Sequence, residues 1–139
     1  MKKILLSAIF VLTASVSYAD QPVQPQSLPQ NIQSFVANNF PGAGIIFAER
    51  DFDSFEVKLN NGSELDFDKS GNWKEIKSYD KFPVQVLPGA VVNSVKAAHP
   101  QATIIKAERK WGGFEIKTSN NMEIMVQENG QIMGQKFDD

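Results

Sequence analysis

The side chains that most often carry chemistry are scarce in this sequence. It contains one histidine, His99, and no cysteine. A nucleophilic triad needs a base, usually histidine, beside its nucleophile, and structural zinc sites use cysteine and histidine ligands. His99 lies on the apolar stripe of an expected helix, directly before Pro100, so we expect it to pack or to end that helix. We therefore predict no catalytic residue, no metal site and no cofactor.

Carboxylates are the other candidates for acid–base chemistry. Glu56, Glu64, Glu115 and Glu123 alternate with apolar residues, a pattern that can place them on one face of a sheet. Glycosidases use a pair of such carboxylates. Charged residues on the wet face of a strand usually only keep a protein soluble, and we interpret these glutamates in that way. We expect that the protein is not an enzyme.

Residues 66–71 imitate the start of a calcium-binding loop, with acids at positions 1 and 3 and glycine at position 6. A bidentate glutamate should occupy position 12, where this chain has Lys77. Strand alternation explains the run more simply, because it directs Asp66 and Asp68 outward and leaves Ser70-Gly71 for a turn. A weak cation site at Asp66 and Asp68 stays an open alternative.

Two aromatic residues are the best candidates for recognition. Phe52 and Trp111 each fall near the expected tip of a hairpin. Large exposed aromatics bury much area at low entropic cost and are enriched in binding hot spots. The alternative is that each ring folds back onto its own sheet. We predict that both residues bind a partner within a polar frame formed by Glu49, Arg50, Glu56, Lys58, Glu108, Arg109, Glu115 and Lys117.

The two tips belong to a sequence that repeats at an offset of 59 residues. Without a gap, residues 28–29 (Leu-Pro) align with 87–88, and residues 48–50 (Ala-Glu-Arg) align with 107–109. In each copy, Leu-Pro precedes a stripe of helical period, and a proline ends it. Strand-like alternation follows, with turn signals such as Asn61-Gly62. These patterns predict an α+β fold of two tandem repeats, each one helix followed by about four antiparallel strands, with the helices packed on one face of the sheet.

The first residues have the pattern of an export signal. Lys2 and Lys3 precede an apolar run at 4–16, and Ser17-Tyr18-Ala19 supplies the small residues of a cleavage site. The run is shorter than the roughly 20 residues of a membrane span. The predicted organisation is a signal peptide at 1–19, a flexible leader at 20–27, a first repeat at 28–76, a connector at 77–86 and a second repeat at 87–139.

The charge that remains after removal of the signal peptide is mildly acidic. Twelve Lys and Arg stand against 16 Asp and Glu, a net charge of −4. Nucleic-acid binding calls for a basic patch, so we predict no nucleic-acid partner. The absence of cysteine excludes disulfides and a lipoprotein anchor. We predict a periplasmic or secreted protein without a stable membrane anchor, whose partner is another periplasmic or secreted protein.

Residues 28–135 resemble the PepSY-like domains of bacterial periplasmic proteins, which are related in fold to the β-lactamase inhibitor protein. The matching segments are Phe-Pro-Gly-Ala-x-Ile at 40–45, Phe-Glu-Val-Lys-Leu-Asn-Asn-Gly at 55–62 and Phe-Asp-Lys-Ser-Gly-Asn-Trp at 67–73. The resemblance implies a protein that binds or inhibits other proteins. The second copy has Met125 and Gln127 in place of Asp66 and Asp68, so those acids cannot serve both copies.

Two functions follow from these observations. The first is a non-catalytic periplasmic module that binds or inhibits another protein through its open sheet face and hairpin tips. The alternative is a binder of a small apolar ligand or cell-envelope component, held in a pocket between the helices and the sheet. An exposed aromatic patch favours the first, and a cavity of roughly 300 Å³ or more favours the second.

Overall fold

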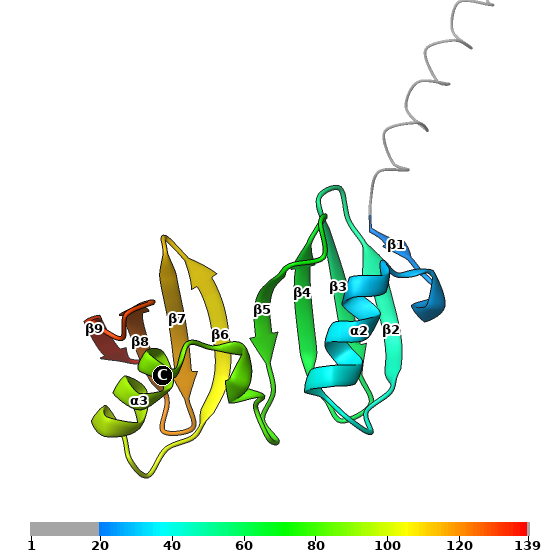
Figure 1. Cartoon of the computed structure of the whole chain (residues 1–139). Helices are drawn as coiled ribbons and strands as arrows, with labels where there is room; N and C mark the ends of the chain where they lie inside the picture. Colours follow the sequence, from blue (N-terminus) through cyan, green and yellow to red (C-terminus); the bar gives the residue numbers. More distant parts are fainter. Residues whose placement is uncertain (1–19, 139) are drawn as a thin grey trace, which may run out of the picture.

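The computed structural model describes residues 20–138, so the predicted signal peptide at 1–19 lies outside the described residues. Two α-helices, two 3₁₀ helices and nine strands occupy the described part (Figure 1). The helices are η1 (Pro25–Ser27), α2 (Gln30–Asn39), η2 (Val84–Val86) and α3 (Gly89–Ala98). The strands are β1 (Gln21–Pro22), β2 (Ile45–Arg50), β3 (Ser54–Leu59), β4 (Glu64–Asp68), β5 (Trp73–Lys77), β6 (Ile104–Lys110), β7 (Gly113–Thr118), β8 (Met122–Gln127) and β9 (Ile132–Phe137).

All nine strands form one antiparallel sheet, in which each strand lies beside its neighbours in sequence. The predicted fold of two tandem repeats, each one helix and about four strands, is therefore wrong, although the α+β class holds. The join is the pairing of β5 with β6, where Glu75, Ile76 and Lys77 lie opposite Glu108, Ala107 and Lys106. An unpaired strand exposes its backbone N–H and C=O groups, and this pairing satisfies them on both strands.

The segment expected to be a flexible leader, residues 20–27, is partly tied to the sheet. Gln21 and Pro22 pair with Arg50 and Glu49, and the Val23 N–H donates a 2.9 Å hydrogen bond to the Ala48 carbonyl. Proline is tolerated here because β1 is an edge strand, where an N–H is not needed on the outer side. The 3₁₀ helix η1 then leads into α2.

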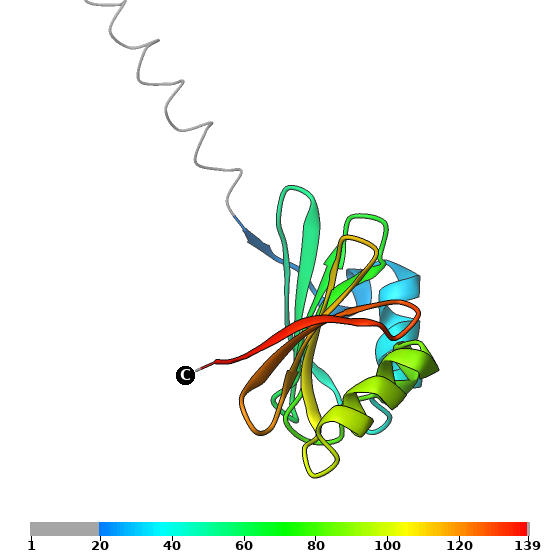
Figure 2. The ribbon, with the colours of Figure 1, turned by 90° about the vertical axis from the view of Figure 1, so that its left-hand side faces the viewer.

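Both α-helices cover the same face of the sheet, and the other face is open (Figure 2). Pro29 and Pro88 are the N-cap residues, and Phe40 and His99 are the C-cap residues. The prediction that His99 ends its helix is confirmed, and its Nε2 lies 2.7 Å from the Gln135 side-chain oxygen.

One hydrophobic core joins the helices to the covered face of the sheet. Ile32 of α2 and Val91 of α3 are fully buried, as are Phe67 of β4 and Ile116 of β7. The Phe67 ring meets the Phe35 ring edge to face, with 5.5 Å between the ring centroids. The helices therefore hold the covered face in place and leave the opposite face free for other contacts.

We expect Phe67→Ala to lower the free energy of unfolding by roughly 3 to 5 kcal/mol, because it removes a fully buried ring. The matched change Phe52→Ala removes a ring that is 90% exposed, and its effect should stay within about 0.5 kcal/mol. Urea denaturation of the two variants measures both values. Equal losses would mean that the assignment of the two rings to core and surface is wrong.

Candidate functional site

Six acidic residues form a continuous row across the open face of the sheet. Each is the direct cross-strand partner of the next, from β2 to β7. Side chains opposite each other have Cβ atoms about 4.5 to 5.5 Å apart, and like charges in such pairs destabilise a sheet. We call this set the carboxylate row: Glu49, Glu56, Asp66, Glu75, Glu108 and Glu115.

A second row of charges runs beside the first, two residues further along each strand. Its members are also direct cross-strand partners, and most of them are lysines. The two rows are about 6.7 Å apart along the strands, which is the rise of two residues. We call this set the lysine row: Lys58, Glu64, Lys77, Lys106, Lys117, Glu123 and Lys136.

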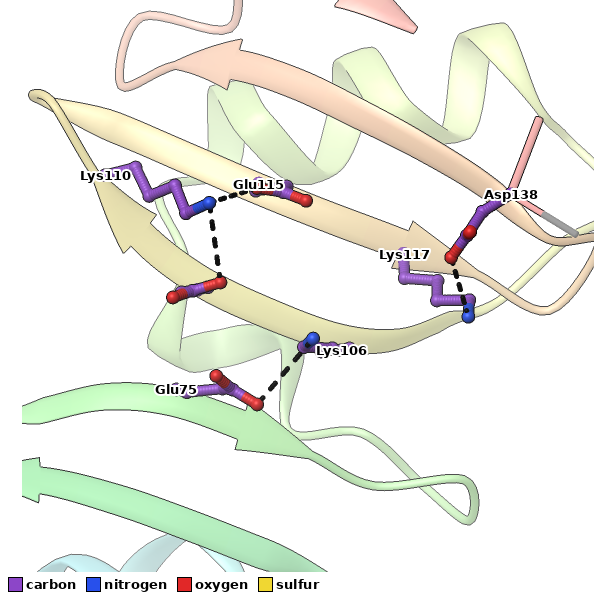
Figure 3. Close-up of polar contacts among 7 residues, drawn as sticks. Glu75, Lys106, Lys110, Glu115, Lys117 and Asp138 are labelled. Carbon is purple, nitrogen blue, oxygen red and sulfur yellow. Dashed lines mark hydrogen bonds and ion pairs between the residues drawn. The ribbon is translucent and has the colours of Figure 1, made fainter. Parts of the chain in front are cut away.

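One half of the carboxylate row is neutralised by lysines (Figure 3). The Lys110 Nζ lies 2.6 Å from a Glu115 carboxylate oxygen and 3.8 Å from one of Glu108. The Lys106 Nζ lies 3.7 Å from a carboxylate oxygen of Glu75. The hydrogen bond from Lys110 holds the pKa of Glu115 below its ordinary value and raises the pKa of Lys110. Repulsion in this half of the row is therefore offset within the protein.

The other half of the row is compensated only in part, because the charges of Lys58 and Lys74 act on Glu49 and Asp66 without forming an ion pair. Glu49, Glu56 and Asp66 form no ion pair with any residue of the described chain. Burial, and then the charges of Glu75 and Glu56, raise the pKa of Asp66 to about 6. The pKa of Glu49 is also raised, first by desolvation and then by the neighbouring charge of Asp20. Negative charge at this end of the row is thus held at a cost in stability.

The unneutralised half forms the floor of a concave site of about 250 Å³, which we call the acidic pocket. Its lining extends from the sheet to Asp20, the first described residue, and to the β2–β3 hairpin, where Asp51 and Ser54 flank the tip. The residues that line it are Asp20, Glu49, Asp51, Ser54, Glu56, Asp66 and Lys74. The charge of Asp51 raises the pKa of Asp20, as expected for two carboxylates close together.

Both predicted aromatic residues extend into solvent at the tips of their hairpins. Phe52 is 90% exposed and Trp111 is 83% exposed, so neither ring folds back onto the sheet. The two tips lie at the same end of the sheet (Figure 1). Trp111 has a φ of 43°, a region that bulky residues seldom occupy. The Lys110 Nζ lies 5.4 Å from the centre of its ring.

The polar frame predicted from the sequence divides between the two faces of the sheet. Arg109 lies on the helix side, where its Nε donates a 2.9 Å hydrogen bond to the Trp73 carbonyl and its guanidinium lies 4.2 Å from the Trp73 ring centre. Arg50 is the cross-strand partner of Phe55, which packs against the core, so it faces the same side. The open face holds the other predicted residues: Glu49, Glu56, Lys58, Glu108, Glu115 and Lys117.

Sequence reasoning missed two members of the carboxylate row, Asp66 and Glu75, as parts of one surface. Each alternates with core residues of its own strand, a signal visible in the sequence. Their alignment across strands depends on register, which includes an irregularity between Asp66 and Phe67. The row could therefore be assembled only from the structure.

The carboxylates do not converge as metal ligands do. Within residues 20–138, no group of three or more His, Asp or Glu side chains could hold a metal ion. Asp68 instead accepts 2.9 Å hydrogen bonds from the backbone N–H groups of Ser70 and Asn72, and these bonds lower its pKa. Asp68 thus closes the β4–β5 turn, whereas Asp66 belongs to the carboxylate row.

The raised pKa of Asp66 predicts a stability that depends on pH. Its pKa is about 6 in the folded protein and 3.8 as an ordinary value, so the charged form opposes folding. The penalty is absent below about pH 4 and complete above about pH 6. We expect Asp66→Asn to raise the free energy of unfolding at pH 8 by roughly 1 kcal/mol, after allowance for solvent screening, and to leave it unchanged at pH 3.5.

The control is Asp68→Asn on the same strand. Its lowered pKa means that the charged form supports folding, so this variant should be less stable than the wild type at pH 8. Denaturant melts at the two pH values measure both effects. A lower stability of Asp66→Asn at pH 8 would contradict the assigned repulsion.

Solved structures of similar sequence and fold are described as those of periplasmic proteins. A protein described as "putative calcium-regulated periplasmic protein" from Bacteroides thetaiotaomicron is 30% identical, with a TM-score of 0.78, over 84% of this chain and 96% of its own. Two "putative periplasmic" proteins from Bacteroides vulgatus are 34% and 25% identical, each with a TM-score of 0.77. They cover 84% and 85% of this chain, and 96% and 99% of their own chains. No curated protein matches the sequence.

The periplasmic location predicted from the sequence is confirmed by these relatives, and the chain is a periplasmic protein. Neither α-helix of residues 20–138 has the length and apolar character of a membrane span. A family model described as "Putative beta-lactamase-inhibitor-like, PepSY-like" matches residues 15–65 and 53–134, nearly the whole chain. The resemblance noted in the sequence is confirmed: this chain belongs to the PepSY-like, beta-lactamase-inhibitor-like family.

Proposed function

We propose that this protein is a non-catalytic periplasmic module that binds the basic surface of another protein. The observation that carries the proposal is the unneutralised half of the carboxylate row, which lies in a pocket directly beside the exposed Phe52 tip. Charge and an apolar anchor are thus available on one contiguous surface.

The repulsion among the carboxylates of the unneutralised half lowers the stability of the folded protein. A basic partner would relieve this repulsion, and the carboxylates therefore support the proposal of such a partner. Glu49, Glu56 and Asp66 are consecutive cross-strand partners, and like charges directly opposite each other destabilise a sheet. Lysines offset the same repulsion in the other half of the row, so the fold itself does not require the charges to stay unpaired. Lys or Arg side chains of a partner would supply the missing compensation through charge-assisted hydrogen bonds.

The aromatic tip supports a protein partner rather than a free cation. A ring that is 90% exposed contributes nothing to the core and gains free energy only when another surface covers it. Hot spots commonly combine such a ring with neighbouring charges that set orientation and association rate. Phe52 therefore serves as the anchor and the acidic pocket as its electrostatic frame.

Calcium regulation and enzyme inhibition, which the descriptions of related proteins mention, are separate from this proposal. The relative from Bacteroides thetaiotaomicron is described as calcium-regulated, whereas residues 20–138 of this chain contain no group of three or more His, Asp or Glu side chains that could hold a metal ion. Inhibition, suggested by the family description, would be one result of binding if the partner is an enzyme whose active site the tips enter.

The proposal is tested by capturing periplasmic proteins on the immobilised exported protein and then measuring the dissociation constant of the purified partner. We expect Phe52→Ala to weaken binding by at least 2 kcal/mol, about thirtyfold. The double variant Glu49→Gln/Glu56→Gln should weaken it at least tenfold at low salt and less at high salt.

The matched control for charge is Glu123→Gln/Glu128→Gln, which removes two charges from other parts of the surface. It should bind like the wild type. If both double variants weaken partner binding equally, the loss of affinity depends only on the net charge of the protein. That result would contradict a binding site at the acidic pocket.

The Trp111 tip is expected to form a second contact with the same partner. Trp111→Ala should weaken binding by at least 2 kcal/mol, about thirtyfold, and leave the melting temperature nearly unchanged. Trp111→Asn is the companion variant, because asparagine suits the positive φ at this position. A large loss of stability with unchanged binding would assign Trp111 to the folded scaffold instead.

A further inference from the structure

The side of the molecule that carries α3 contains a groove of about 350 Å³. It lies between α3, the segment 79–84 and the start of β6. Phe82, Val92, Val95 and Ile104 give it apolar walls, and Lys81 and Lys96 also line it. Neither the acidic pocket nor the Phe52 tip shares any of these residues.

A longer connection before η2 builds one wall of the groove. Pro22 lies opposite Glu49 on β2, and η1 begins three residues later. Glu75 lies opposite Glu108 on β6, and η2 begins nine residues later. The extra length forms the loop that carries Lys81 and Phe82.

Hydrogen bonds hold this loop in place. The Ser78 N–H donates a 2.9 Å bond to the Ile105 carbonyl, and the buried hydroxyl of Ser78 lies 2.9 Å from that of Ser63. The Ser78 hydroxyl also donates a 3.1 Å bond to the Asp80 carbonyl. Phe82 packs against the core. The wall is therefore formed before any ligand arrives, which reduces the entropic cost of binding.

The charge of the groove is opposite to that of the whole protein. Two lysines line it, and no Asp or Glu of the described chain does. Lys81 has a φ of 57°, an uncommon backbone conformation for a residue other than glycine. Because both lysines belong to the lining, their positive charges would attract an anionic group, while an apolar tail would lie against Val92 and Ile104.

We propose that this groove binds a free fatty acid, with the carboxylate between Lys81 and Lys96 and one acyl chain along the apolar walls. The volume lies near the lower end of the range for small-molecule sites, which suits one chain rather than a two-chain phospholipid. This site does not depend on the protein-binding function proposed above, since the two surfaces have different residues.

The test is titration of the exported protein with dodecanoate, followed by amide chemical shifts and calorimetry. We expect shifts centred on Lys81, Val92, Lys96 and Ile104. Decanoate should bind roughly tenfold more weakly, because it lacks two CH₂ groups. Dodecanol, which has the same chain and no charge, should also bind at least tenfold more weakly.

Variants locate the site. Lys81→Gln/Lys96→Gln should weaken dodecanoate binding at least tenfold, and the control Lys69→Gln/Lys136→Gln should leave it unchanged. Val92→Phe fills the groove and should abolish binding. If that variant fails to fold, the lysine variants and the comparison of dodecanoate with decanoate still test whether the groove binds a fatty acid.

Three results would overturn the proposal: no binding below millimolar dodecanoate, equal binding of dodecanol and dodecanoate, or shifts centred on the acidic pocket. Binding that is unchanged in Lys81→Gln/Lys96→Gln would overturn it as well. Vesicles of phosphatidylglycerol that compete as strongly as dodecanoate would replace a free fatty acid with a lipid surface as the ligand.

Discussion

The register between neighbouring strands is the constraint on which the surface of this protein depends. Because each strand pairs with the next in sequence, one choice of register places a carboxylate opposite a carboxylate from β2 to β7. A slip of one residue would turn every such side chain into the core. The hydrophobic core under α2 and α3 therefore fixes the charges on the open face, and the repulsion among them is tolerated because the core holds the register.

Local signals in the sequence predicted the helix ends and the exposure of the two aromatic tips. The same signals could not predict the pairing of β5 with β6, because alternation reveals which face a residue occupies and not which strand lies beside it. The segment 20–27 was expected to be a flexible leader, yet Gln21 and Pro22 pair with β2, because an edge strand accepts proline. Arg50 and Arg109 were grouped with glutamates next to them in sequence, yet adjacent residues of a strand point to opposite faces.

The two sides of the sheet have separate chemistry. The open side carries the carboxylate row and the lysine row. Only one half of the carboxylate row forms ion pairs with lysines of the described chain. The covered side carries the core and an apolar groove lined by Lys81 and Lys96. The groove depends on the longer connection before η2, which lies within the connector predicted at 77–86, but no sequence pattern predicted that this connector forms the wall of a groove. A difference in length between corresponding connections, such as those before η1 and η2, can therefore indicate a binding site where no sequence motif does.

The pairing of β5 with β6 also determines how far apart the two aromatic tips can be. Phe52 and Trp111 belong to hairpins separated by β4 and β5, so the separation and relative rotation of their rings follow from the right-handed twist accumulated across these strands. The β5–β6 ladder has only three residue pairs, fewer than the five of β3–β4. This ladder is the shortest of those between the two hairpins, so fewer residue pairs fix the relative position of Phe52 and Trp111 here than at β3–β4 or β4–β5.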